Sequence, residues 1–267
     1  MNTSVASPAP LDIKVSASGD LREAVDYAKA KIGRSLRVAD RPVRAARVRL
    51  TRHGDPAVQR PVLAQANVDV DGRWVRAHVE GATAVEAIDR LDDRLRRRLR
   101  RAAQHWEARR GGLPTGAPHE WRHQSEPEQR PAYFPRPAED RRVVRRKAFS
   151  LGTLTLDEAA VEMDLLDYDF HLFTEKATGY AAVLSRDGQT GYRLTLVAPR
   201  DREDLAPFDL PVTISGLPAP CWTTEQATEH LELSGSPYLF FIEAAGGRAC
   251  VLYHRYDGHY GLITPAG

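Results

Sequence analysis

The sequence predicts an α+β protein with one N-terminal domain and a tandem pair of smaller C-terminal units. Short runs of alternating apolar residues indicate strands, residues 83–110 have helical periodicity, and residues 143–267 repeat one pattern twice. The expected segments are a disordered tail at 1–10, an N-terminal domain at 11–110, a flexible linker at 111–142, and two repeats at 143–199 and 211–267.

The N-terminal domain is expected to fold as β-α-β-β-β-α, a four-stranded sheet with two helices on one face. The expected strands are 11–17, 45–51, 62–70 and 74–79, and the expected helices are 20–33 and 83–110. Gly33 is taken as the end of the first helix. Asp71-Gly72 between two alternating runs is a strong hairpin signal. Arg47 and Arg49 alternate with apolar residues and therefore fall on the polar face of their strand.

The last helix of this domain is the longest element that the sequence predicts. Thr83 followed by Glu86 forms a capping box, and Gly111 ends the helix. At 1.5 Å per residue it is roughly 40 Å long. Its apolar stripe consists of Ile88, Leu91, Leu95, Leu99, Ala102 and Trp106. This stripe is expected to pack on the sheet.

Arginines form a row on the opposite side of the same helix. The row consists of Arg90, Arg94, Arg97 and Arg101. A helix face on which both charges alternate is usually only solvated, but the acidic residues here lie off the row. Guanidinium groups recognise phosphates in a planar, bidentate way. The row therefore favours nucleic acid as the partner.

The C-terminal half contains an internal repeat at an offset of 68 residues, with a two-residue insertion before the last strand. Each copy reads as β-α-β-β-β, with a capping box at Thr155 or Thr223 and a hairpin turn at Gly179 or Gly247. A unit of about 55 residues is marginal alone. The two copies are therefore expected to pack together as an intrachain pseudo-dimer.

The charge distribution, apolar runs and cysteine content of the chain restrict the classes of function that fit it. Residues 11–110 carry 23 basic and 14 acidic side chains, whereas residues 143–267 carry 10 and 17, so the two halves differ in charge sign. No apolar run reaches the length of a membrane span, and no signal pattern is present. Cys221 and Cys250 are interpreted as buried small hydrophobic residues in a reduced, cytoplasmic protein.

The sequence contains no set of residues that suggests catalysis. Phosphate-binding loops, nucleophile elbows and zinc-protease motifs are absent, and the histidines lack ligands at metal spacing. We expect no metal, no cofactor and no enzymatic activity. In the linker, Trp121, Tyr133 and Phe134 have no assigned role.

Four segments resemble the long ribosome hibernation-promoting factors. They are the helix entry Glu80-Gly81 with Ala87-Ile88-Asp89, and the stretches Val143–Leu151, Glu162–Phe170 and Tyr253–Pro265. The doubled C-terminal unit is most similar to the actinobacterial, hypoxia-associated branch. The resemblance implies that the N-terminal domain binds rRNA at the decoding region of the small subunit. The candidate rRNA-binding residues are Lys31, Arg90, Arg94, Arg97, Arg98, Arg100 and Arg101.

The expected function is therefore ribosome hibernation under stress, with messenger and transfer RNA excluded and single ribosomes stabilised without pairing. The C-terminal pair is expected to dock elsewhere on the ribosome, with the large subunit as one candidate, and the chain to be a monomer. A possible secondary RNA contact consists of Arg141, Arg142, Arg145, Arg146 and Lys147. The alternatives are a regulatory module that binds a basic protein through the acidic half, and a nuclease.

Overall fold

The computed structural model describes residues 12–37, 39, 41–53, 59–111, 136–187, 191–255 and 257–266, without the side chains of 104–111 and 138. The chain divides into two compact units, which we describe separately. The N-terminal unit holds Met1–Thr115 with Leu165–Asp167, and the C-terminal unit holds Gly116–Asp164 with Tyr168–Gly267. None of the described helices combines the length and the apolar character that a membrane span requires.

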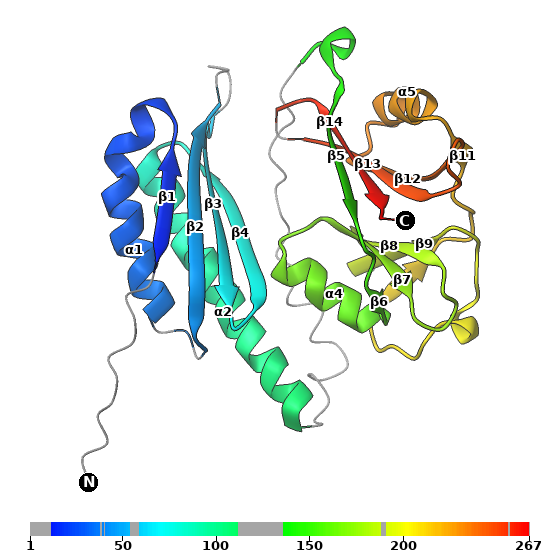
Figure 1. The fold of residues 1–267 in the computed structure, drawn as a ribbon, viewed down its shortest axis with the longest axis horizontal. Helices are drawn as coiled ribbons and strands as arrows, with labels where there is room; N and C mark the ends of the chain where they lie inside the picture. Colours follow the sequence, from blue (N-terminus) through cyan, green and yellow to red (C-terminus); the bar gives the residue numbers. More distant parts are fainter. Residues whose placement is uncertain are drawn as a thin grey trace. The chain divides into compact units, whose positions relative to one another are not determined.

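The N-terminal unit has the predicted element order (Figure 1). Its elements are β1 (Ile13–Ala17), η1 (Gly19–Ala24), α1 (Val25–Arg37), β2 (Val43–Arg52), β3 (Val62–Val70), β4 (Arg73–Gly81) and α2 (Ala84–Gly111). The sheet order is β1-β2-β3-β4, with β1 parallel to β2 and the other pairs antiparallel. Both helices lie on one face of the sheet, which confirms the predicted α+β architecture.

Two glycines of this unit show where local sequence signals succeed and fail. Asp71 and Gly72 both have positive φ, 53° and 83°, and join β3 to β4 in the predicted tight turn. The prediction that Gly33 ends the first helix is wrong, because α1 continues to Arg37. A Cβ on Gly33 would lie only 3.1 Å from Cδ1 of Ile13, so this glycine allows close packing of α1 on β1.

In its described residues, the C-terminal unit contains two five-stranded sheets and two α-helices. In chain order its main elements are β5 (Val143–Phe149), β6 (Thr153–Leu154), α4 (Leu156–Leu165), β7 (Phe170–Glu175), β8 (Ala181–Asp187), β9 (Gly191–Leu196), β10 (Val212–Ile214), β11 (Cys221–Trp222), α5 (Thr224–Ser234), β12 (Tyr238–Glu243), β13 (Ala249–His254) and β14 (Tyr260–Pro265). Both predicted capping boxes form: Thr155 with Glu158, and Thr223 with Gln226.

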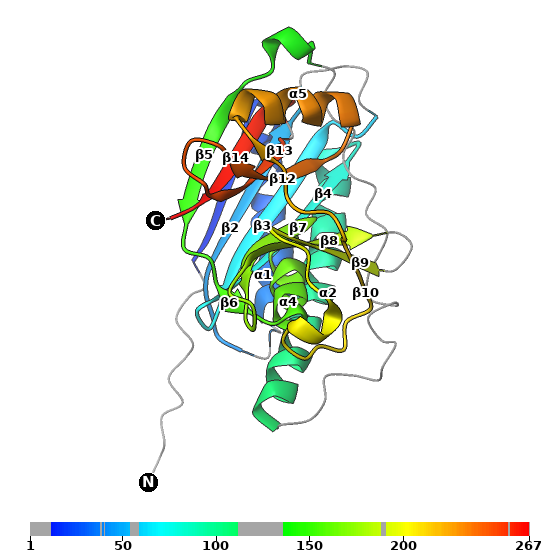
Figure 2. The same cartoon turned by 90° about the vertical axis from the view of Figure 1, so that its right-hand side faces the viewer.

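The two repeats exchange their leading strands. The sheet orders are β10-β9-β8-β7-β6 and β11-β12-β13-β14-β5. β5 of the first repeat therefore pairs with β14 of the second, beside which it lies in Figure 2, and β10 of the second repeat pairs with β9 of the first. Each repeat completes the sheet of the other, a connection that the sequence analysis did not predict.

The offset of 68 residues continues through the last strand of each repeat. Leu184 pairs with Leu194 in the first repeat, and Leu252 pairs with Leu262 in the second. Tyr192 and Tyr260 occupy matched buried positions. The predicted two-residue insertion is therefore wrong. That insertion came from matching Gly188 and Gly191 with Gly258 and Gly261, whereas the fold matches the buried tyrosines.

A shared apolar cluster joins the two sheets of the C-terminal unit. It contains Leu172 and Val183 from the first repeat and Phe240 and Val251 from the second, all buried. The repeats thus pack together as the predicted pseudo-dimer. The interpretation of Cys221 as buried is wrong, because this residue is exposed on the two-residue edge strand β11; Cys250 is buried as predicted.

Candidate nucleic-acid interface

Helix α2 positions the predicted arginines by burying its apolar stripe. Glu86 N donates to Oγ1 of Thr83 at 3.1 Å and fixes the start of the helix. Ile88, Leu91 and Leu95 are fully buried against the sheet. This packing sets the rotation of α2 and therefore which arginines reach the surface.

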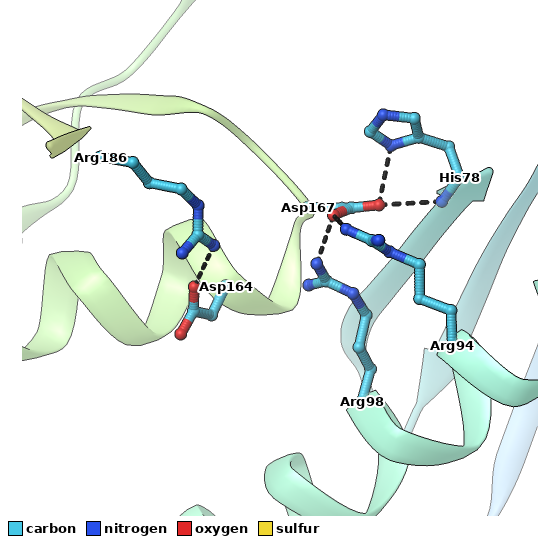
Figure 3. A network of polar contacts seen from close by, with 6 residues as sticks. All are labelled: His78, Arg94, Arg98, Asp164, Asp167 and Arg186. Atoms are coloured by element: carbon cyan, nitrogen blue, oxygen red, sulfur yellow. Dashed lines mark hydrogen bonds and ion pairs between the residues drawn. The ribbon is translucent and has the colours of Figure 1, made fainter. Parts of the chain in front are cut away.

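Arg94 and Arg98 are held by a buried carboxylate. Both guanidinium groups donate to Oδ1 of Asp167, which is grouped with the N-terminal unit (Figure 3). His78 donates its backbone N–H to Oδ2 at 2.8 Å, and its Nδ1 lies 2.7 Å from the same oxygen. Burial alone would raise the pKa of Asp167, but His78, Arg98 and Arg94 hold it well below its usual range.

The expectation of an open arginine row is therefore wrong for Arg94, whose side chain is 15% exposed. Arg98 is also buried, at 9% side-chain exposure. The sequence gives no local signal for Asp167, because it follows Arg94 by 73 positions. Its carboxylate occupies donors that a phosphate would otherwise use.

The other candidates on this unit have mixed surroundings. Arg100 is exposed, and Arg97 and Arg101 are half-buried. Arg90 donates to the carbonyl oxygen of Glu80 at 2.9 Å. Lys31 lies 2.8 Å from Asp89, a contact that raises the pKa of the lysine.

A buried polar contact that the sequence does not predict joins α1 and α2. Asp92 is 1% exposed and accepts a hydrogen bond from Oγ of Ser35 on α1. Arg96 pairs with the same carboxylate at 2.8 Å. An aspartate in the first half of an arginine-rich helix appears solvent-facing by sequence, and only the position of α1 reveals its buried partner.

The secondary basic candidates lie at and before β5. Arg142, Arg145 and Arg146 are exposed, Arg141 and Lys147 are half-buried, and Nε of Arg141 donates to the carbonyl oxygen of Arg136. At the matched positions of β10 the second repeat has Thr213 and Ile214. The basic strand therefore occurs on one sheet of the C-terminal unit and not on the other.

Within the described ranges, no three His, Cys, Asp or Glu side chains group as a metal site would require. Another polar pair, Arg186 with Asp164, lies within the C-terminal unit and is also drawn in Figure 3. Trp121, Tyr133 and Phe134 fall outside the described residues, as does most of the predicted linker.

Comparison with known proteins gives concordant matches. The family model described as Sigma 54 modulation/S30EA ribosomal protein C terminus matches residues 138–194 and again 216–262, once in each repeat. A dormancy associated translation inhibitor of Mycobacterium tuberculosis is 38% identical over 88% of this chain and 81% of its own length. A ribosome hibernation promotion factor of Deinococcus radiodurans is 28% identical over 62% of this chain and 88% of its own.

Among solved structures, the N-terminal domain of Thermus thermophilus Protein Y is 31% identical and covers 34% of this chain and 98% of its own, with a TM-score of 0.29. The extent of the mycobacterial match and the double match of the C-terminal family model agree with the motifs at Val143–Leu151 and Tyr253–Pro265. The chain belongs to the long ribosome hibernation-promoting factor family.

Proposed function

We propose that this protein is a ribosome hibernation factor whose N-terminal unit binds rRNA at the decoding region of the small ribosomal subunit. Bound there, it blocks messenger and transfer RNA, inhibits translation and stabilises idle ribosomes. The observation that carries the proposal is the arginine-rich surface of α2, on a chain whose relatives are named as translation inhibitors and hibernation factors.

Phosphate neutralisation supplies the affinity in this mechanism. Arg97 and Arg101, both half-buried, and the exposed Arg100 lie on the α2 surface. Each guanidinium group that contacts a phosphate releases counterions, so binding weakens steeply with salt. Sequence-specific base contacts are unnecessary, because the target is one folded rRNA shape.

The C-terminal unit docks elsewhere on the ribosome through the reach of the 111–142 linker, and it does not pair ribosomes. The strand exchange supports this part of the proposal. β5 and β10 satisfy within one chain the sheet edges that a second chain could otherwise fill. At an effective concentration near mM, the intrachain partner outcompetes a second molecule. The basic strand β5 offers a secondary RNA contact for docking.

Charge reversal on α2 tests the first part. We expect Arg97→Glu, Arg100→Glu and Arg101→Glu together to abolish co-sedimentation with small subunits, while thermal unfolding stays close to wild type. The control reverses three exposed arginines of the C-terminal unit, Arg193, Arg202 and Arg248, which gives the same change in net charge. Equal ribosome binding by both triple variants would remove the α2 assignment.

Sucrose-gradient sedimentation tests the second part. Ribosomes mixed with a stoichiometric excess of the protein should sediment as single particles that carry it. A peak of ribosome pairs that contains the protein would overturn the intrachain role of the two repeats.

A further inference from the structure

The N-terminal sheet has a second surface that the proposed function does not use. Alternate residues of its strands point away from the helices, and we call this side the open face. It carries Lys14, Arg47, Arg49, Gln65, Asn67 and Trp74. Register pairs Arg47 with Asn67 and Arg49 with Gln65. The six side chains therefore form neighbouring rows across four strands.

The open face lacks the composition of a protein-packing surface. On the helix side, β3 presents Val62, Ala64, Ala66, Val68 and Val70, all at most 2% exposed. On the open side the same central strand presents the amides Gln65 and Asn67, with Leu63 and Asp69 at its two ends. A sheet side that lacks large apolar residues at its centre is suited to water or a polar ligand rather than to another layer.

Positive charge gathers on the open face in the middle of β2. At the ends of β2, Arg44 pairs with Asp71 and Arg52 pairs with Asp20. In the middle of the strand, Arg47 and Arg49 are exposed, and in the described part of the chain no acidic group pairs with either. Lys14 lies directly across from Arg47 in the parallel pairing, and its ammonium group lies 3.7 Å from a carboxylate oxygen of Asp12. Two exposed guanidinium groups on the same face of one strand are suited to an anionic ligand, because arginine binds phosphates in a planar, bidentate way.

The neighbouring groups favour RNA over an acidic protein. The Trp74 side chain is 47% exposed at the end of the same face, where its ring is free to stack on a base. Amide side chains such as Gln65 and Asn67 both donate and accept hydrogen bonds, as base edges and 2′-hydroxyls require. Carboxylate ligands would use the arginines but neither the ring nor the amide acceptors.

We propose that the open face binds single-stranded RNA, with the backbone along Arg47 and Arg49 and a base stacked on Trp74. In a ribosome-bound state, RNA would then be held on the sheet side as well as on the α2 side. The proposal rests on the proposed function only for the biological source of the RNA, since the surface is argued from its own charges and register.

Fluorescence anisotropy of the full chain with a labelled single-stranded RNA of mixed sequence tests it. We expect Arg47→Gln with Arg49→Gln to weaken binding at least about 10-fold and to lower the salt slope by about 1.4. Trp74→Ala should weaken binding roughly 5- to 100-fold. The matched control is Arg44→Gln with Arg52→Gln, which removes the same charge from the ends of the same strand and should change affinity less than 3-fold.

Equal RNA affinity for the Arg47/Arg49 variant and its control would overturn the open-face proposal. So would stronger binding of a poly-glutamate peptide than of the RNA, which would assign the face to an acidic protein. Co-sedimentation with ribosomes separates this outcome from the proposed function. If the variants lose RNA as expected but wild type fails to bind ribosomes, the open face stands and the proposed function fails.

Discussion

At Phe173 the first repeat buries a ring opposite Ala182, and 68 residues later the second repeat buries Phe241 opposite Cys250 in the same register. Most buried positions of the two repeats correspond in this way. Several surface positions differ: Arg145 and Arg146 in β5 correspond to Thr213 and Ile214 in β10. One backbone therefore presents two different surfaces.

This contrast between buried and surface positions shows which residues the fold constrains. Buried positions must fill the same volume in both copies, so Met163 corresponds to Leu231, a close match in size. Surface positions carry no such restriction. A charge that appears on only one copy, as on β5, is therefore better evidence of function than any feature that both copies share.

The largest expected effect tests whether the matched cores are equivalent. Phe173→Ala and Phe241→Ala each remove a fully buried ring and should each cost about 3–5 kcal/mol in free energy of unfolding. Because the repeats exchange β5 and β10, each variant should lower a single transition of the whole C-terminal unit. Urea unfolding followed by circular dichroism measures this.

Two separable transitions, with each variant moving only one of them, would contradict the shared unit. A control variant is Leu233→Ala, which truncates an apolar side chain that is 87% exposed and should change stability by no more than about 0.5 kcal/mol.

The sequence alone predicted much of this architecture, for reasons that are local. The Asp71-Gly72 turn and the two capping boxes depend on residues that are close in the chain, and all three formed as expected. The internal repeat predicted two similar units, and each of them folded as a strand, helix and hairpin.

Long-range choices could not be predicted in the same way. β9 and β14 are the last strands of the two repeats, and each leaves one edge open for a further strand. β5 could therefore pair with either of them. The contact of Asp167 with Arg94 and Arg98 could not be predicted, because Asp167 follows them by 73 and 69 positions and no local pattern around it indicates its partners. The sequence therefore placed the candidate interface on α2, but which of its arginines are buried was visible only in the structure.

A smaller loss of stability is expected at a position in the last strand where the two repeats have different residues. A Cβ on Gly261 would lie 2.4 Å from Cζ of Tyr253, whereas the matched pair of the first repeat is Ser185 and Arg193. Gly261→Ala should therefore cost about 1–3 kcal/mol, although alanine is usually favoured over glycine in a strand. Arg193→Ala, the matched control, should cost less than about 1 kcal/mol.

A double-mutant cycle with Tyr253→Ser sharpens this test. If the ring causes the cost, Gly261→Ala should be less damaging in the Tyr253→Ser background. A stabilising effect of Gly261→Ala in the wild-type background would show that Tyr253 does not cover this position.

The two repeats use different polar pairs near the ends of α4 and α5, and the pair in the second repeat should make folding stability depend on pH. In the second repeat Tyr260 donates its hydroxyl to Oε1 of Glu232 at 2.7 Å, where the first repeat pairs Arg186 with Asp164. Burial and this hydrogen bond raise the pKa of Tyr260 from 10.0 to about 12. Tyr260→Phe should cost about 1–2 kcal/mol at neutral pH.

The sign of the pH effect follows from the raised pKa. Folding favours the protonated phenol, so its contribution is complete below pH 10 and is lost as the pH rises from 10 through about 12. The stability difference between wild type and Tyr260→Phe should shrink over that range. A difference that stays constant from pH 9 to pH 12 would show that the phenol is not protonated preferentially in the folded protein.

The smallest expected effect concerns the two thiols. Cys250 occupies the place of Ala182, so Cys250→Ala should change stability by less than about 1 kcal/mol. Burial raises the pKa of the Cys250 thiol from 9.0 to about 11, whereas Cys221 is exposed. A thiol reagent at pH 8 should therefore label Cys221 quickly and Cys250 only after unfolding. Cys221→Ser should abolish the fast phase, and fast labelling that persists in this variant would mean that Cys250 is accessible in the folded protein.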